Sequence, residues 1–381
     1  MLQLTPELNA GGVERTTLEV AEALIAAGHR AHVVSAGGRM EDELIQIGAQ
    51  LHRMDIGSKN ILTYPQRVRA LKTIIKEQEI DIVHARSRAP AWPAHAAAKA
   101  MGVPFLATYH GIYNANSALK RGYNAVMTKG ALTIANSNMT KAHIIKEHKL
   151  DAEKIIVIHR GVDLAQFNPD KIKTEDITAT RKSWGAHDSE TVLLLPGRLT
   201  AWKGQGVAIK ALSHLQNSHV RLVIMGDAQG RNAYVETLKS LATQHGVEAR
   251  CTFENHTSNM PLMLAASDIV LSTSIEPEAF GRVAVEAQAI GKPIIASAHG
   301  GSLETVLDGQ TGLLITPNDS HALAKAIDSV TAPAEPNVFG ANLSDYDPHF
   351  ARNHISETFS KKALQLKTLA VYNQLLATPC V

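Results

Sequence analysis

The chain has 381 residues, of which 45% are hydrophobic, and its formal net charge is +2. This length exceeds one ordinary hydrophobic core, so we expect two domains, and the near-neutral charge argues against dedicated nucleic-acid binding. Residues 1–175 hold 22 Lys/Arg and 17 Asp/Glu, whereas residues 176–381 hold 16 and 19. The basic first half fits an anionic acceptor or a lipid surface, or merely the scatter of solvated charges.

The sequence also limits the cellular compartment. Two cysteines, Cys251 and Cys380, supply neither a disulfide framework nor a cysteine-based metal site. Residues 1–6 lack the pattern of a signal peptide, and no stretch approaches the ~20 apolar residues that span a bilayer. We therefore expect a cytoplasmic protein. Peripheral contact with the inner face of the plasma membrane, suggested by basic residues within 67–76 and at 120–121, stays open.

In the first half, short apolar runs alternate with helical patterns. A strand at 2–4 precedes a helix over 14–27 that Gly28 ends, and a strand at 31–35 precedes a helix over 41–48. A strand at 51–56 leads to a helix over 65–78, and the remaining strands are expected at 80–84, 105–109, 132–135 and 155–158. Strands alternating with helices predict a parallel sheet with right-handed crossovers.

The same alternation restarts after residue 190. Strands are expected at 192–195, 221–225, 251–253, 268–272, 293–296 and 312–315, and a helix at 349–377. The polar stretch between Asn168 and Trp184 is the expected linker. The predicted fold is α/β, with two doubly wound Rossmann-like domains facing a cleft. We expect an N-terminal domain over 1–168, completed by the C-terminal helix 350–377, and a second domain over 169–349.

The segment from Glu278 to Glu286 carries the strongest functional signal. It follows the strand at 268–272, and a helix is expected to start near Gly281. Amides at a helix start can hold a diphosphate, and the flanking carboxylates can accept hydrogen bonds from sugar hydroxyls. The alternatives are structural, because Arg282 and Glu286 are four apart and can form a surface ion pair, while Glu278 can be a first-turn acid.

Arg198 and Lys203 form a second candidate cluster, directly after the strand at 192–195. Ligands of α/β folds bind at this end of a strand, and both cations suit phosphate oxygens. Two solvated loop cations are the alternative. Gly11-Gly12 allows close approach of the backbone to a ligand without forming a dinucleotide fingerprint. His110 ends the strand at 105–109 and is expected in the same crevice.

Two further groups are weaker candidates. Asp345-Tyr346-Asp347 has an Asp-x-Asp spacing, but no strand leads into it, and we assign it no metal role. His84, Arg86 and Arg88 follow a strand, and they either contact an anionic acceptor or are ordinary loop charges.

With these residues assembled, the chain resembles the retaining nucleotide-sugar glycosyltransferases of family 4, which have the GT-B fold. The resemblance covers nearly the whole chain. Its most specific parts are the Glu278–Glu286 segment, Arg198 with Lys203, and a run of motifs comprising Gly300-Gly301-Ser302-Leu303-Glu304, Gly309-Gln310-Thr311-Gly312-Leu313-Leu314 and Pro317-Asn318-Asp319. Arg160-Gly161-Val162-Asp163 also looks like the segment that enters the second domain, with Arg160 where Asn is more usual.

The resemblance implies roles for these residues. Glu286 would bind the ribose hydroxyls, Glu278 and the backbone at Phe280 and Gly281 would hold the transferred sugar, and Arg198 with Lys203 would neutralise the leaving diphosphate. Gly12 would let its loop reach the diphosphate, and His110 would face the reaction centre. The implied donor-binding set also includes Gly226 and Arg282.

The expected function is therefore transfer of a sugar from a nucleoside diphosphate sugar, with UDP-sugar favoured, to a glycan or lipid-linked acceptor in lipopolysaccharide or other cell-envelope biosynthesis. Fixed cations and helix-start amides can stabilise the departing diphosphate, so no metal or other cofactor is expected. A hydrolase-type pair of nucleophile and acid is not evident. The alternatives are a GT-B nucleotide-sugar epimerase and a non-catalytic sugar-nucleotide-binding protein.

Overall fold

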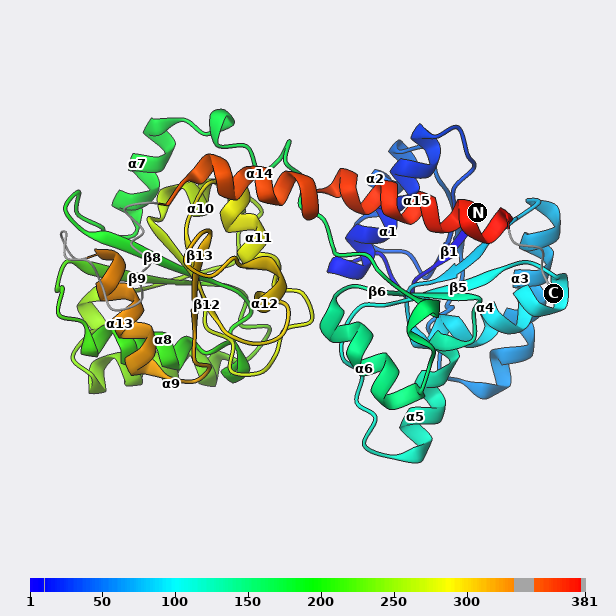
Figure 1. The fold of residues 1–381 in the computed structure, drawn as a ribbon, viewed down its shortest axis with the longest axis horizontal. Coiled ribbons are helices and arrows are strands. Elements are labelled where there is room, and N and C mark those ends of the chain that lie inside the picture. The colour runs from blue at the N-terminus through cyan, green and yellow to red at the C-terminus, as the bar shows by residue number, and fades with distance from the viewer. Residues whose placement is uncertain (10, 332–345, 378–381) are drawn as a thin grey trace. The chain divides into compact units, whose positions relative to one another are not determined.

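A computed structural model describes residues 1–9, 11–331 and 346–377. The chain forms two compact units, Met1–Gly161 with Lys361–Val381, and Val162–Ser360. Each unit contains a parallel sheet with helices on both faces (Figure 1). The predicted fold class is confirmed.

The first unit is built on a seven-stranded sheet of order β3-β2-β1-β4-β5-β6-β7. Its strands are β1 (Leu2–Leu4), β2 (His32–Ser35), β3 (Gln50–Arg53), β4 (Val83–Ala85), β5 (Phe105–Tyr109), β6 (Leu132–Ala135) and β7 (Ile155–Val157). Its helices are α1 (Gly12–Ala26), α2 (Glu41–Gln46), α3 (Tyr64–Glu77), α4 (Arg88–Met101), α5 (Ala118–Asn124), α6 (Asn138–His148) and α15 (Lys361–Ala377), with short 3-10 turns at η1 (Ile61–Thr63), η2 (Ala125–Thr128) and η3 (Ala152–Lys154).

The second unit is built on a six-stranded sheet of order β10-β9-β8-β11-β12-β13. Its strands are β8 (Thr191–Pro196), β9 (Val220–Met225), β10 (Cys251–Glu254), β11 (Ile269–Ser272), β12 (Ile294–Ser297) and β13 (Gly312–Ile315). Its helices are α7 (Thr174–Ser183), α8 (Gln205–His214), α9 (Asn232–Gln244), α10 (Met260–Ala266), α11 (Arg282–Ala289), α12 (Ser302–Thr305), α13 (Ser320–Thr331) and α14 (Pro348–Thr358), with 3-10 turns at η4 (Pro169–Lys171), η5 (Ala201–Lys203) and η6 (Glu248–Arg250).

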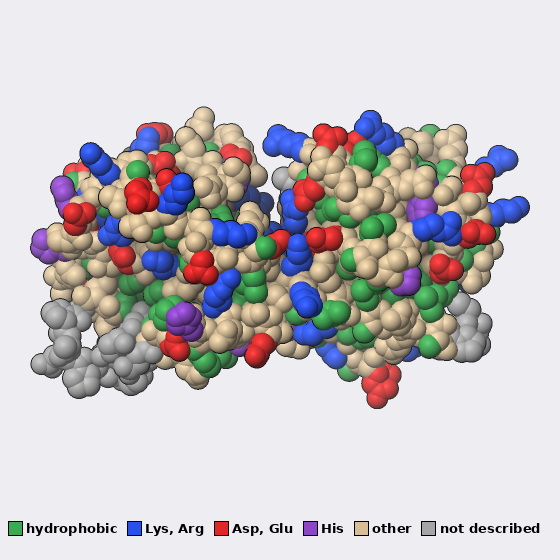
Figure 2. Space-filling model, turned by 90° about the horizontal axis from the view of Figure 1, so that it is seen from above, with side chains coloured by type: hydrophobic (Ala, Val, Ile, Leu, Met, Phe, Trp, Pro, Cys, Tyr) green, Lys and Arg blue, Asp and Glu red, His purple; other side chains and the backbone are tan. Residues whose placement is uncertain are grey.

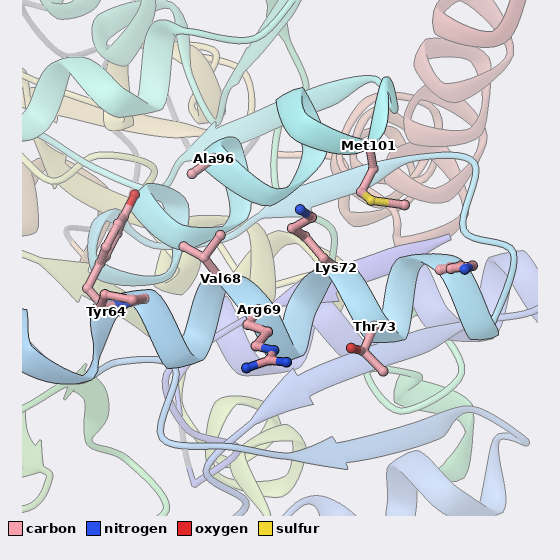
Figure 3. A pocket seen from close by; sticks show the side chains of 9 residues that line it. Tyr64, Val68, Arg69, Lys72, Thr73, Ala96 and Met101 are labelled. Atoms are coloured by element: carbon pink, nitrogen blue, oxygen red, sulfur yellow. The ribbon is translucent and has the colours of Figure 1, made fainter.

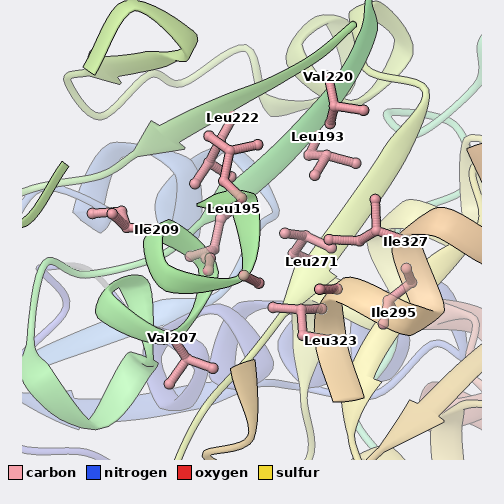
Figure 4. Close-up of a cluster of buried hydrophobic side chains, with 14 of the residues drawn as sticks. Leu193, Leu195, Val207, Ile209, Val220, Leu222, Leu271, Ile295, Leu323 and Ile327 are labelled. Atoms are coloured by element: carbon pink, nitrogen blue, oxygen red, sulfur yellow. The ribbon is translucent and has the colours of Figure 1, made fainter. Parts of the chain in front are cut away.

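Each sheet buries apolar side chains on both faces, which explains why central strands such as β8 and β11 are mostly apolar runs rather than alternating patterns. In the second unit, Leu193, Leu195 and Leu271 point from the strands toward α8 and α13 (Figure 4). On the opposite face, Val270 and Ile294 pack with buried residues of α10, α11 and α14. The first unit repeats this arrangement, with α3, α4 and α6 on one face and α1, α2 and α15 on the other.

The expected linker and first domain boundary differ from the structure. The polar stretch after Asn168 forms η4 and α7 of the second unit rather than an extended connection. Val162, Phe167 and Trp184 are buried in the core of that unit, so the unit begins at Val162 and not after residue 168. Local polarity suggested a linker because the few apolar residues that anchor this segment are widely spaced.

The single C-terminal helix expected over 349–377 is wrong, because the structure has two helices there. α14 belongs to the second unit and α15 to the first. Between them, the Val162 amide donates to the Phe359 carbonyl at 2.8 Å, and Val162 forms a bridge with Ser360. This pairing and the burial of Phe359 in the second core end the helix.

The surface is polar on the face that Figure 2 displays, where Lys and Arg side chains are interspersed with Asp and Glu. Within the described residues, no helix combines the length and apolar character needed to cross a membrane.

Candidate functional site

The loop between β11 and α11 contains Glu278, the first residue of the Glu278–Glu286 segment. Gly281 caps α11 in the left-handed region, at φ 79°, which favours glycine. A Cβ on Gly300 would lie 2.4 Å from the Glu278 carbonyl oxygen, and one on Gly301 would lie 2.3 Å from that of Phe280. The Gly301 amide donates to the Glu278 carbonyl at 2.8 Å. Because only glycine allows this approach, the Gly300-Gly301 pair fixes the backbone that leads into α11.

Glu278 forms an ion pair that the sequence did not predict. Lys203 Nζ donates to Glu278 Oε1 at 2.7 Å, and the Ser274 hydroxyl donates to the same oxygen. The Lys203 and Glu278 side chains are only 13% and 15% exposed. The Ile275 amide also donates to the Trp202 carbonyl at 2.7 Å, so the loops after β8 and β11 are joined by both backbone and side chains.

Arg198 and Lys203 both lie close to one aromatic ring. The Arg198 guanidinium carbon is 5.8 Å from the centre of the Trp202 ring, and Lys203 Nζ is 4.6 Å from it. Both distances are within the range of a cation–π contact. The structure therefore brings together the two cations that the sequence paired, with Trp202 as an element that the sequence analysis did not use.

Gly226 lies at the end of the neighbouring strand. A Cβ at this position would be 1.8 Å from the Gly197 carbonyl oxygen, and the Gly197 amide donates to the Met225 carbonyl at 2.9 Å. Gly226 thus allows the ends of β8 and β9 to approach closely beneath the Arg198 loop. The close approach of the two strand ends is a structural role for Gly226. A role of Gly226 in donor binding remains a prediction.

Glu286 and Arg282 form the ion pair that was the alternative to a binding role. Arg282 Nη2 donates to Glu286 Oε1 at 2.7 Å, and Arg282 Nε donates to the same oxygen at 3.1 Å. The Glu286 side chain is mostly buried, whereas Arg282 is considerably more exposed. The pair orients the carboxylate on α11. A role of either residue in binding a nucleotide remains a prediction.

In the first unit, His110 and Gly12 both contact Arg160. His110 follows β5, and its Nδ1 lies 3.5 Å from Arg160 Nη2. A Cβ on Gly12 would be 1.9 Å from Arg160 Nη1, so the guanidinium occupies the space that the absent side chain leaves open. Burial, followed by the positive charges of Arg160 and Arg86, holds the pKa of His110 well below its usual range. His110 is therefore a neutral imidazole near pH 7.

Two of the weaker candidates are buried and are not loop charges. His84 lies within β4, where its ring nitrogens are each 2.7 Å from the hydroxyls of Tyr372 and Thr108. Arg86 Nε donates to the Gln3 side-chain oxygen at 2.9 Å. This network fastens α15 to the sheet, since Tyr372 belongs to that helix. The sequence reasoning missed it because its members come from distant parts of the chain.

Arg88, the third member of that group, starts α4 instead. Its guanidinium carbon lies 4.2 Å from the centre of the Tyr113 ring, and its Nη1 donates to the Asn124 side chain at 3.0 Å. These contacts hold Arg88 against α5 and the loop before it.

The described residues contain no cluster of three or more metal-ligating His, Cys, Asp or Glu side chains. Asp345 of the weak Asp-x-Asp candidate lies outside the described residues. Asp347 caps α14, where its Oδ1 accepts from the His349 amide at 2.8 Å. This capping bond gives Asp347 a structural role. The absence of a cofactor requirement remains a prediction.

The chain matches two family models. Residues 10–166 match Glycosyltransferase Family 4, and residues 176–337 match Glycosyl transferases group 1. A glycosyltransferase from Rickettsia africae ESF-5 is 35% identical over 98% of both chains, with a TM-score of 0.90. Anabaena Alr3699/HepE, solved in complex with UDP, is 26% identical over 98% of this chain and 99% of its own, with a TM-score of 0.84.

A curated relative, D-inositol 3-phosphate glycosyltransferase of Mycobacterium sp. (strain KMS), is 34% identical over 212 residues, which are 55% of this chain. The match spans about half of that relative, at 46% of its length. Two parallel sheets with flanking helices form a GT-B architecture, which these solved structures share. The chain belongs to the family 4-type glycosyltransferases.

Proposed function

We propose that the protein is a retaining glycosyltransferase that uses a nucleoside diphosphate sugar, with UDP-sugar as the favoured donor. The acceptor would be a glycan or a lipid-linked saccharide of lipopolysaccharide or another cell-envelope polysaccharide. The observation that carries the proposal is the joined pair of loops in the second unit, where Lys203 contacts Glu278 and Arg198 lies across the Trp202 ring. The solved complex of Anabaena Alr3699/HepE with UDP supports the choice of base.

The chemistry of these groups suits a departing diphosphate. Cleavage of the sugar–phosphate bond leaves positive charge on the sugar and additional negative charge on the diphosphate. Arg198 and Lys203 would stabilise that negative charge, together with amides at the start of α11, from positions fixed before the reaction. The amino group of Lys203 would exchange part of its contact with Glu278 for a phosphate oxygen. These cations supply the charge that a metal would otherwise provide, so we propose a metal-independent reaction.

The remaining residues would position the sugar and the nucleoside. Glu278 and the backbone at Phe280 and Gly281 would hold sugar hydroxyls, and Glu286 would accept from the ribose. His110, which is neutral, can accept or donate one hydrogen bond to a hydroxyl without adding charge. Retention would follow if the departing phosphate accepted the acceptor's proton on the same face of the sugar. We further propose that the protein works in the cytoplasm, in peripheral contact with the inner face of the plasma membrane.

Ligand-dependent melting tests the donor site. A ligand that binds only the folded protein raises its melting temperature, so UDP-, GDP-, ADP- and dTDP-sugars are compared with and without EDTA. We expect a shift with UDP-sugars that persists in EDTA and is lost in Lys203→Ala. Lys210→Ala is the matched control, because it removes the same type of side chain from an exposed position on α8, seven residues after Lys203. An equal shift in both variants would contradict the donor site.

The stereochemistry needs a separate measurement. The anomeric configuration of the product, read by NMR coupling constants, should equal that of the donor. Inversion would refute the retaining mechanism and leave the donor site standing. Donor binding without transfer to any cell-envelope acceptor would favour a non-catalytic binding protein.

A further inference from the structure

Arg160 contacts His110 within the first unit. Arg160 follows β7 and His110 follows β5, so both lie at the carboxyl edge of the sheet. Arg160 Nη2 lies 3.4 Å from the His110 carbonyl oxygen and 3.5 Å from His110 Nδ1. A Cβ on Gly12 would be 1.9 Å from Arg160 Nη1 and 2.7 Å from its Cζ. The guanidinium can therefore lie beside His110 only because residue 12 has no side chain.

The contact with Arg160 determines which ring nitrogen of His110 carries the proton. A guanidinium is always charged in proteins and offers only N–H donors, with no acceptor. His110 Nδ1 faces such a donor, so it must hold a lone pair, because a proton on Nδ1 would oppose the N–H of Arg160. A second proton on the ring is also disfavoured, since burial and the positive charges of Arg160 and Arg86 lower the pKa of His110. The ring is therefore neutral, with its proton on Nε2.

A second contact fixes the backbone of His110. Asn136 is buried, and its Nδ2 donates to the His110 carbonyl at 3.1 Å. The Thr140 hydroxyl donates to Asn136 Oδ1 at 2.8 Å, which orients the amide so that its donor end meets His110. Asn136 and Arg160 thus hold the same carbonyl oxygen, and Arg160 in addition determines the position of the proton on the ring.

The other ring nitrogen of His110, Nε2, is buried, and no atom in the described parts of the chain forms a hydrogen bond with it. His110 lines a cavity of about 10 Å³, whose lining also includes Thr16, Arg86, Asn136 and Arg160. This volume suits about one water molecule, unlike the groove of about 630 Å³ between α3 and α4 that Figure 3 shows. A buried N–H without an acceptor is destabilising, so Nε2 is ready to donate to an oxygen atom of a ligand or a water.

The residue type at position 160 decides between the two tautomers of His110. The family segment that this part of the chain resembles more usually has asparagine where this chain has Arg160. An asparagine side chain carries both an acceptor oxygen and a donor nitrogen, so it can face either tautomer of a histidine. Arginine can face only the tautomer whose Nδ1 is unprotonated. Arginine at this position therefore restricts His110 to one hydrogen-bonding role.

We propose that Arg160 is a positioning residue that holds His110 as the neutral tautomer with its proton on Nε2. His110 then donates a hydrogen bond from Nε2 to an oxygen of the bound substrate, while its one lone pair stays occupied by Arg160. A ring in this state cannot remove a proton from the acceptor hydroxyl, so His110 is not a general base. That proton must leave to another group, which in the proposed retaining reaction is the departing phosphate. The inference rests on the proposed function and adds roles for His110 and Arg160 to it.

NMR of the full chain, with histidine labelled by the NMR-active nitrogen isotope, tests the tautomer directly. The two ring nitrogens differ in chemical shift when only one carries a proton, and the His110 signals are identified by their loss in His110→Gln. At neutral pH and without substrate, we expect a protonated Nε2 and an unprotonated Nδ1 in the wild-type protein and in Arg160→Lys, which keeps a cation that can only donate. Arg160→Asn should show both tautomers in exchange, whereas the control Arg30→Asn, which removes an exposed arginine paired with Glu79, should match the wild type. A proton on Nδ1 of the wild-type ring, or the wild-type tautomer in Arg160→Asn, would overturn the proposal.

Steady-state kinetics of sugar transfer measure the consequence for catalysis. Arg160→Asn should lower kcat several-fold while changing the KM for the donor by less than about twofold, and Arg160→Lys should restore most of the loss. His110→Gln places an amide near the position of Nε2, so it should keep a kcat roughly tenfold higher than that of His110→Asn, whose amide reaches only the position of Nδ1. Equal kcat values for these two variants would contradict donation from Nε2. The NMR measurement needs no transfer, so a wild-type protein with the expected tautomer but no activity would refute the proposed function and leave the tautomer assignment standing.

Discussion

The contact between Lys203 and Glu278 leads to a prediction about both stability and ligand binding. The two side chains are 2.7 Å apart and mostly buried, and they are 75 positions apart in the chain. Lys203→Met leaves the Glu278 carboxylate with the Ser274 hydroxyl alone, whereas Glu278→Gln keeps a neutral hydrogen-bond partner for Lys203. The double variant removes both charges.

The expected magnitude follows from burial and distance. Two charges 4 Å apart attract by about 4 kcal/mol at an effective dielectric constant near 20, and the cost of desolvation offsets part of this. We expect Lys203→Met to lower the free energy of unfolding of the second unit by about 2 kcal/mol and Glu278→Gln by about 1 kcal/mol. The double variant should recover about 1–2 kcal/mol relative to the sum of the single changes.

Urea unfolding followed by tryptophan fluorescence measures these values. Trp184 and Trp202 lie in the second unit, so a Trp92→Phe background reports that unit alone. Trp184 is buried in its core and should respond to unfolding. A coupling free energy below about 0.5 kcal/mol would refute the reasoning, because such a value is typical of exposed ion pairs and not of buried ones.

The same pair predicts an effect on ligand binding. Glu278 compensates the charge of Lys203 when no donor is bound, so Glu278→Gln should bind UDP several-fold more tightly while losing transfer. Calorimetric titration with UDP measures this. Weaker binding of UDP by Glu278→Gln than by the wild-type protein would contradict a role for Lys203 at the diphosphate.

Three further predictions concern other parts of the molecule. Burial lowers the pKa of His84, and so do the positive charge of Arg86 and the proximity of His110, so below pH ~6.5 the unfolded chain takes up a proton that the folded unit does not. As the pH falls, His84 should therefore contribute up to about 1.4 kcal/mol per pH unit to the loss of stability, and urea unfolding at pH 7 and 5 should show a smaller loss in His84→Gln than in the wild-type protein. Phe359→Ala should lower the free energy of unfolding by about 3–5 kcal/mol, measured by thermal denaturation, because the Phe359 ring is buried with its centre 5.8 Å from that of Phe280. Phe350→Ala is the control, since Phe350 is exposed on α14, and it should change the free energy of unfolding by less than about 0.5 kcal/mol. Gly12→Ala should alter the free energy of unfolding by less than about 1 kcal/mol, because the new methyl group displaces only the flexible end of Arg160. The same variant should reduce the rate of sugar transfer roughly tenfold or more. If this loss of activity persists in an Arg160→Ala background, displacement of the guanidinium is not the cause of the loss.

The sequence by itself determined the two parallel sheets. Runs such as 192–195 and 269–271 are continuously apolar because both faces of the sheet are covered, and this property is visible in a few adjacent residues. Gly281 before α11 was also readable, because a left-handed backbone conformation restricts the residue type locally. These features depend on neighbours in the chain, so local patterns are sufficient to predict them.

Only the tertiary structure decided which distant side chains meet. His84 contacts Tyr372 across 288 positions, and Lys203 contacts Glu278 across 75. The break between α14 and α15 likewise depends on the pairing of Val162 with Ser360, which no helical pattern within 349–377 reveals. Periodicity describes the face on which a residue lies, but a contact between elements depends on how those elements pack, and that is set by the whole core.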